Sequence, residues 1–275
     1  MGKSSTTVID TVSAEIAAST NRLLATAAGL SDADVAKPSR LPGWTRGHVL
    51  THLARNADGQ INLLTWARTG VETPQYPSAE ARAAGIEAGA GRPLALQIAD
   101  LEDSAARLAE AVRVMPREAW SATVSGRRPP RHPAWYCLVR RLRELEVHHV
   151  DLDAGYDCAD WADTFVHREL TDTALILADL GDSPLGGIDA DDTGRSWRGL
   201  GDGPVISGTE RDLLGWLTGR GGGEGLRSRP RGPLPTPPPW PPLPAPSAMP
   251  AAPPASWPIS VAGLDGPAPD RGEDR

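Results

Sequence analysis

The chain has 275 residues, of which 40% are hydrophobic, and its 35 acidic and 28 basic side chains give a formal net charge of −7. This length and composition suffice for two domains with packed cores, whereas the acidic balance argues against a nucleic-acid-binding protein, which needs a basic surface. No apolar run is long enough to predict a membrane span, and the N-terminus lacks the apolar segment of a signal peptide. We therefore expect a cytoplasmic protein without nucleic-acid or membrane partners, and its oligomeric state is left open.

The first half of the chain has the apolar periodicity of long helices. Val8, Val12, Ile16 and Leu23 recur at helical spacing and predict a first helix that ends near residue 29. A linker follows and closes with a tight turn at "LPGW", whose tryptophan, Trp44, we interpret as a packing anchor. The next predicted helix, residues 46–69, has a suitable N-cap in Thr45.

Two further helices are predicted before residue 158. Residues 70–93 read as a polar loop, and an amphipathic helix then extends from residue 94 until Pro116 stops it. A loop or hairpin, "TVSGRRPPRHP", leads to a fourth helix at about residues 134–154. Four long amphipathic helices favour a helix bundle, so we expect a mainly α fold with a bundle domain over residues 1–158.

The pattern changes after the predicted bundle. Residues 159–243 contain a helical stretch, "DTFVHRELTDTALILADL", then strand and turn signals in "SWRGLGDGPVISG" and a short capped helix in "TERDLLGWLTGR", which predict a small α/β domain. More than half of the chain's 27 prolines follow residue 228. Residues 244–275 are therefore predicted to form a proline-rich, disordered tail, because such a composition favours extended chain and cannot build a core.

The two cysteines do not suggest a site of their own. Cys137 and Cys158 lack C-x-x-C spacing, so they predict neither a disulfide framework nor a thiolate zinc site. We interpret Cys137 as a buried structural thiol and Cys158 as incidental. Any thiol chemistry would need a thiol from outside the chain.

The stretch "RELEVHHVDL" predicts half of a metal site. Glu144 and His148 are four residues apart on the fourth predicted helix, so their side chains can converge on one ion. His52 on the second predicted helix is the natural third ligand, because metal sites in bundles draw on facing helices. Two histidines and one glutamate leave one tetrahedral position open, which is typical of catalytic zinc. Asp151 could fix the His148 ring by accepting its other N–H.

Other pairs have nearly the same spacing. Glu146 and His149 lie on the same predicted helix, and His48 and His52 are also four residues apart. The apolar periodicity favours Glu144 and His148, since His149 lies closer to the apolar stripe, but spacing alone does not choose. The alternative interpretation is that these residues form a solvated helix face and bind no metal.

The motifs "LPGWTRGHVLTHLARNAD" and "RRLRELEVHHVDL" resemble those of the mycothiol-dependent maleylpyruvate isomerase family, within the DinB-like metalloenzyme superfamily. The similarity extends through "SAEARAAGIEAGAGRP" and "SGTERDLLGWLTGR" and weakly into "LPTPPPW", and so covers roughly residues 5–242. The proline-rich extension departs from the family pattern.

The resemblance implies a fold, ligands and cofactors. It implies a DinB-like four-helix bundle followed by a small α/β domain. It implies that His52, Glu144 and His148 hold Zn²⁺, which selects among the pairs above, and that Arg82 and Arg220 face the active site as catalytic residues. Mycothiol or another low-molecular-weight thiol is the implied second cofactor.

The implied reaction is a cis–trans isomerisation of maleylpyruvate type. A thiol bound to zinc loses its proton at neutral pH, adds to the conjugated double bond, and is expelled after the new single bond has rotated, while the arginines hold the substrate carboxylates. A thiol S-transferase would share every step up to the adduct. A non-enzymatic binding or regulatory protein, which recruits partners through the tail and holds no stoichiometric metal, is the third reading.

Overall fold

The computed structural model describes residues 7–257 and 266–267. It divides into two compact units. The first comprises Met1–Asp157 and Ala248–Ser256, and the second comprises Cys158–Ser247 and Trp257–Arg275. The domain boundaries at residues 158 and 243 stay a prediction.

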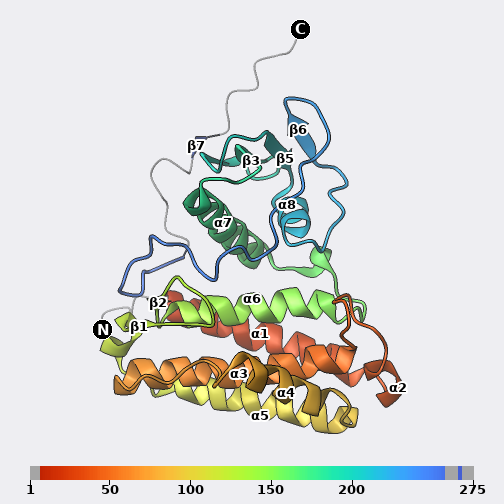
Figure 1. The fold of residues 1–275 in the computed structure, drawn as a ribbon, viewed down its shortest axis with the longest axis vertical. Coiled ribbons are helices and arrows are strands. Elements are labelled where there is room, and N and C mark those ends of the chain that lie inside the picture. Colours follow the sequence, from red (N-terminus) through yellow and green to blue (C-terminus); the bar gives the residue numbers. More distant parts are fainter. Residues whose placement is uncertain (1–6, 258–265, 268–275) are drawn as a thin grey trace, which may run out of the picture. The chain divides into compact units, whose positions relative to one another are not determined.

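The first unit is built from long helices that enclose a common core. These are α1 (Val8–Ala28), α3 (Arg46–Thr69), α5 (Leu94–Arg113) and α6 (Tyr136–Asp151). Helices α1 and α3 each contact both α5 and α6, as Figure 1 shows. Each of them contributes leucines to the shared core, which includes Leu23, Leu50, Leu53, Leu101 and Leu145. The helices predicted from apolar periodicity are thus present, and their apolar faces meet in one core.

Local signals set the ends of α3, the helix that carries His52. Thr45 accepts a hydrogen bond from the His48 amide, and the two residues form a reciprocal capping box. Gly70 ends the helix in the left-handed region, with φ of 73°, which costs a residue without Cβ very little. Both ends lie where the sequence predicted them.

The predicted loop over residues 70–93 is wrong, because it contains helix α4 (Ala79–Ala90). Ser78 caps α4 by accepting from the Ala81 amide, and the helix packs on α3. Its face against the protein consists of small residues and Ile86, so apolar periodicity gave almost no signal.

Short elements complete the first unit. They are α2 (Asp32–Val35), the 3₁₀ turn η1 (Arg117–Ser121), and a two-stranded hairpin of β1 (Thr123–Val124) and β2 (His132–Pro133). The hairpin was one of the two outcomes predicted for "TVSGRRPPRHP".

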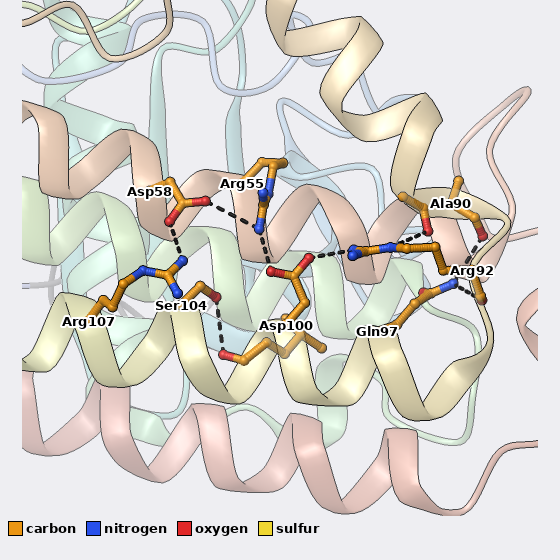
Figure 2. A network of polar contacts seen from close by, with 10 residues as sticks. Arg55, Asp58, Ala90, Arg92, Gln97, Asp100, Ser104 and Arg107 are labelled. Atoms are coloured by element: carbon orange, nitrogen blue, oxygen red, sulfur yellow. Dashed lines mark hydrogen bonds and ion pairs between the residues drawn. The ribbon is translucent and has the colours of Figure 1, made fainter.

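A network of charged side chains joins α5 to α3, and Figure 2 shows it. Arg107 donates to Asp58 at 2.7 Å, and Arg55 lies 3.3 Å from the same carboxylate. Arg55 also pairs with Asp100, which is shared with Arg92. Each partly exposed pair contributes no more than about 1 kcal/mol, but pairs along the two helices favour one register of α5 on α3.

The second unit packs two helices against a mixed sheet. Helix α7 (Asp163–Leu180) follows the short turn η2 (Cys158–Asp160), and α8 (Glu210–Leu217) follows the third of the five strands. The sheet order is β6–β5–β3–β4–β7, formed by Arg227–Arg229, Val205–Gly208, Gly187–Ala190, Arg195–Arg198 and Gly266–Pro267. Strands β3 and β5 are parallel and the other pairings antiparallel. Leu170, Ile188, Trp197, Ile206 and Leu213 belong to its core.

Part of the proline-rich tail makes defined contacts. Within the first unit, the Trp135 indole N–H donates to Pro250 O at 3.1 Å, and the Val8 amide donates to Pro254 O. Within the second unit, Ser247 donates to Asp179. Disorder is therefore not confirmed for residues 244–257, while residues 258–265 and 268–275 lie outside the described part.

The described chain is mainly helical with small sheets, as the sequence predicted. None of its described helices is long and apolar enough to cross a membrane.

Candidate metal centre

Helices α3 and α6 bring the three predicted metal ligands together. Nε2 of His52 lies 2.9 Å from Oε2 of Glu144, and Nε2 of His148 lies 3.3 Å from the same oxygen. The two imidazole rings are nearly perpendicular, with centroids 4.7 Å apart. One ligand atom from each residue lies within 4.8 Å of the other two, and no other such group was found among the described histidines, cysteines and carboxylates.

These donors fit a zinc ion in chemistry and spacing. Bonds of about 2.0–2.2 Å in tetrahedral geometry place neighbouring ligand atoms roughly 3.3 Å apart. The separations between the two imidazoles and the carboxylate oxygen lie close to that value. Two imidazoles and one carboxylate leave a fourth position free for another ligand.

Asp151 fixes the orientation of the His148 ring. Its Oδ2 lies 2.8 Å from Nδ1 of His148, one helical turn away, and the carboxylate is buried. Since Nδ1–H donates to Asp151, Nε2 is the nitrogen that faces Glu144, and it would give up its proton when a metal binds. This arrangement is the one predicted from the sequence, and it raises the basicity of the imidazole.

Burial and mutual hydrogen bonding set the protonation of the three groups. Burial lowers the pKa of His52 to about 4. Burial would also lower the pKa of His148, but its hydrogen bonds to Asp151 and Glu144 outweigh that effect and raise it to about 9. Burial would raise the pKa of Glu144, yet its hydrogen bonds with both histidines hold it well below the usual value. Glu144 is therefore a carboxylate at neutral pH.

Arg82 reaches the same site from α4. Its Nη2 lies 3.2 Å from Nδ1 of His52, and its guanidinium lies 5.7 Å from the centre of the Tyr76 ring. Helix α4, which the sequence analysis predicted to be a loop, therefore places Arg82 beside His52. Its role toward a substrate stays a prediction.

Arg220 lies in the second unit, just after α8. Its Nη1 donates to Thr218 O at 2.5 Å, and its guanidinium lies 5.9 Å from the centre of the Trp240 ring. A place for Arg220 at the active site also stays a prediction.

The alternative ligand pairs face elsewhere. Nε2 of His149 lies 2.8 Å from Oγ1 of Thr26, and its ring stacks on Tyr156 at 3.7 Å. Glu146 accepts hydrogen bonds from Ser19 and Tyr156. Both side chains therefore serve the packing of α6 against α1. His48 points its Nε2 at Glu87, 3.1 Å away, while Nδ1 takes part in the cap of α3.

Other predicted features match the structure. Cys137 is buried, and burial raises the pKa of its thiol to about 12, so it is not a nucleophile at neutral pH. The Trp44 ring meets the His52 ring edge-on at 5.5 Å and stacks on His48 at 6.0 Å. Trp44 therefore packs beside the ligand on α3, which agrees with an anchor.

Comparison with known protein families shows the family to which the chain belongs. The model of the mycothiol maleylpyruvate isomerase N-terminal domain matches residues 16–153, just over half of the chain. The chain belongs to this family. The family match spans α3 and α6 and thus all three candidate ligands.

Solved structures agree with the family assignment. A crystal structure of a mycothiol-dependent maleylpyruvate isomerase is 29% identical, with a TM-score of 0.76, and the similarity covers 84% of this chain and 97% of that one. The structure of a histidine-to-alanine mutant with the same name is 28% identical over the same shares, also with a TM-score of 0.76. No significant match was found among curated proteins. The matches place this member of the mycothiol maleylpyruvate isomerase family among isomerases.

Proposed function

We propose that the chain is a zinc-dependent cis–trans isomerase that acts on a substrate of maleylpyruvate type and uses mycothiol, or another low-molecular-weight thiol, as its cofactor. The observation that carries the proposal is the convergence of His52, Glu144 and His148 from two helices on one point. Family membership supports the reaction class and the thiol. The first unit is proposed to be a DinB-like four-helix bundle, and the proposed location is the cytoplasm.

In this proposal the side chains of α3 and α6 hold the metal. His52 and His148 offer Nε2 atoms and Glu144 offers one carboxylate oxygen, while Asp151 keeps the His148 ring in the ligating orientation. A bound zinc ion would lower the pKa of a thiol at its open position. The buried setting of His52 keeps its imidazole neutral and so ready to ligate.

In this proposal the side chains of the protein position the substrate, and the nucleophile comes from the thiol cofactor. The guanidinium of Arg82 lies within hydrogen-bonding distance of His52, and its planar fork suits a substrate carboxylate. Cys137 is buried with a raised pKa, which is why the attacking thiol is proposed to come from a cofactor. Arg220 is proposed as the second carboxylate-binding residue, on the family resemblance alone.

A thiol S-transferase is the second candidate, because the same ligands would serve it. The two activities differ in the fate of the thiol: an isomerase returns it unchanged, whereas a transferase consumes one thiol per product. A non-enzymatic regulatory protein is the third candidate, and it requires no stoichiometric metal.

Metal content tests the proposal first. We expect about one zinc per purified chain by elemental mass spectrometry, lost in His52→Ala, Glu144→Ala and His148→Ala. His167→Ala is the control, because it removes a histidine of the second unit that lies beside Glu210 and is not one of the three candidate ligands. Wild-type protein without zinc, also after zinc addition, would contradict the ligand assignment.

Product analysis then separates the two enzymatic candidates. Purified zinc-loaded protein is incubated with maleylpyruvate and mycothiol, and the free thiol that remains is compared with the amount of maleylpyruvate consumed. Recovery of all the thiol supports the isomerase. Loss of one thiol per product identifies the transferase.

A further inference from the structure

Arg82 on α4 forms no ion pair with a carboxylate among the described residues. Its side chain is half-buried, and its guanidinium lies 3.2 Å from Nδ1 of His52 and over the face of the Tyr76 ring. By contrast, Arg55 and Arg107, in the network between α3 and α5, each pair with a carboxylate. Arg82 is thus a cation whose hydrogen-bonding partner is a candidate metal ligand.

The two neighbours of the His52 ring fix the position of its proton. Because a guanidinium has only N–H donors, Nδ1 of His52 accepts the hydrogen bond from Arg82. Because an ionised carboxylate has only acceptors, Nε2 of His52, 2.9 Å from Oε2 of Glu144, carries the proton and donates it. Only the neutral tautomer with its proton on Nε2 satisfies both contacts.

Metal ligation requires the other tautomer of His52. A neutral imidazole that binds a metal through Nε2 carries its proton on Nδ1, and that N–H needs an acceptor. Arg82 has no acceptor to offer. The arrangement at His148 is the opposite, because Asp151 lies 2.8 Å from Nδ1 and accepts its proton. Asp151 therefore assists ligation by His148, whereas Arg82 competes with a metal for His52.

We propose that the Arg82–His52 hydrogen bond and metal binding exclude each other, so that a bound metal frees the Arg82 guanidinium for an anionic ligand at the centre. The charge of the ion acts in the same direction, since a cation at His52 repels the guanidinium. The Tyr76 ring, 5.7 Å away, still attracts the freed guanidinium through its face. This inference rests on the proposed function, in which the freed Arg82 receives a substrate carboxylate. The metal accordingly binds before the substrate.

The tautomer of His52 is the direct test and requires no activity. Two-bond ¹H–¹⁵N correlation spectra of the labelled full chain locate the protons of its six imidazoles, and His52→Gln assigns the His52 signals. After treatment with a chelator, we expect the His52 proton on Nε2, and zinc should move it to Nδ1. A proton on Nδ1 in the chelator-treated protein would overturn this inference alone. Failure to bind zinc would overturn the proposed function as well.

Zinc affinity tests the competition for His52. Arg82→Met removes the donor, so we expect zinc to bind about tenfold more tightly or better in competition with a chromophoric chelator. Arg55→Met is the matched control, because Arg55 also lies close to His52 along the chain but pairs with Asp58 and Asp100, with no described contact to a candidate ligand. It should change the affinity by no more than about threefold. An unchanged or weaker affinity in Arg82→Met, or equal gains in both variants, would contradict the competition.

Chemical modification tests the release of Arg82. Phenylglyoxal reacts with accessible guanidinium groups, and peptide mapping by mass spectrometry compares Arg82 with Arg55 in the same sample. Zinc should at least double the relative rate at Arg82, because its guanidinium no longer bonds His52. An equal or lower relative rate with zinc would show that Arg82 is not released.

Discussion

His148 and His149 are adjacent on α6 but contact different neighbouring helices. Successive residues of an α-helix point about 100° apart, so His148 meets His52 of α3 while His149 meets Thr26 of α1. The first is a candidate ligand and the second a packing residue. Their difference arises from what surrounds α6, which is packed on both sides and is not a solvated helix.

Asp151 should matter for metal affinity although it is not a ligand. Asp151→Asn leaves the shape nearly unchanged but removes the negative charge that holds the His148 Nδ1–H. We expect zinc affinity to fall about 10–100-fold, measured by competition with a chromophoric chelator. Asp153→Asn, at an exposed carboxylate two residues on, should leave the affinity unchanged; an equal loss there would contradict the positioning role.

His132 should make the protein sensitive to acid. It is buried, with Nδ1 3.0 Å from Pro133 O and Nε2 2.9 Å from the guanidinium of Arg140. Burial, with Arg140 and Arg143 adding to it, lowers its pKa to about 3. The unfolded chain, with a histidine pKa near 6.5, therefore binds more protons than the folded chain between pH 6.5 and 3.

Stability contributed by neutral His132 is accordingly complete above about pH 6.5 and is lost as the pH falls toward 3. The measurement is urea unfolding at pH 7 and pH 4.5. His132→Gln should show a smaller difference between the two pH values than wild type does. An unchanged difference would show that other groups cause the acid sensitivity.

At the scale of the element, the start of α3 determines where His52 stands. Thr45→Ala removes the side chain that accepts from the His48 amide, and such a loss costs about 0.5–2 kcal/mol of the free energy of unfolding. Urea unfolding measures it. Thr73→Ala, at a partly exposed residue of the loop after α3, should cost no more than about 0.5 kcal/mol; equal effects of the two changes would rule out a capping contribution.

The contact of α1 with α6 depends on Glu146. This buried carboxylate accepts from Ser19, Arg22 and Tyr156. Glu146→Ala leaves buried hydroxyls without their acceptor, and we expect a loss of about 1–3 kcal/mol. In a double-mutant cycle with Tyr156→Phe the two losses should be less than additive. Full additivity would mean that the pair does not interact in the folded protein.

At the scale of the whole molecule, the late segment Ala248–Ser256 belongs to the first unit. A chain that ends at residue 247 loses the acceptor of the buried Trp135 indole and the bond from the Val8 amide to Pro254. We expect it to melt at a lower temperature by differential scanning calorimetry. A chain that ends at Trp257 also lacks β7 but keeps these contacts, so it should melt at a higher temperature than the chain that ends at residue 247; equal melting temperatures of the two truncated chains would contradict a contribution from residues 248–257.

Some features of the chain follow from the sequence alone. The long helices, the Thr45 cap and the terminal Gly70 depend on residues a few positions apart, so local patterns identify them. The spacing of Glu144, His148 and Asp151 likewise places the three on one face of one helix, and the family motifs add His52. These signals suffice to predict a mainly helical chain and half of its candidate site.

Other features depend on contacts between residues far apart in the sequence. Helix α4 lacks an apolar stripe, because small residues suffice where it packs on α3, and Arg82 reaches His52 only through that packing. Spacing could not show which of His148 and His149 is the candidate ligand, because the role of each side chain depends on the helix that it contacts. Nor could it show that Arg141 is buried and donates to the Leu53 carbonyl of α3. Burial and partner choice are properties of the assembled helices, and only the tertiary structure decided them.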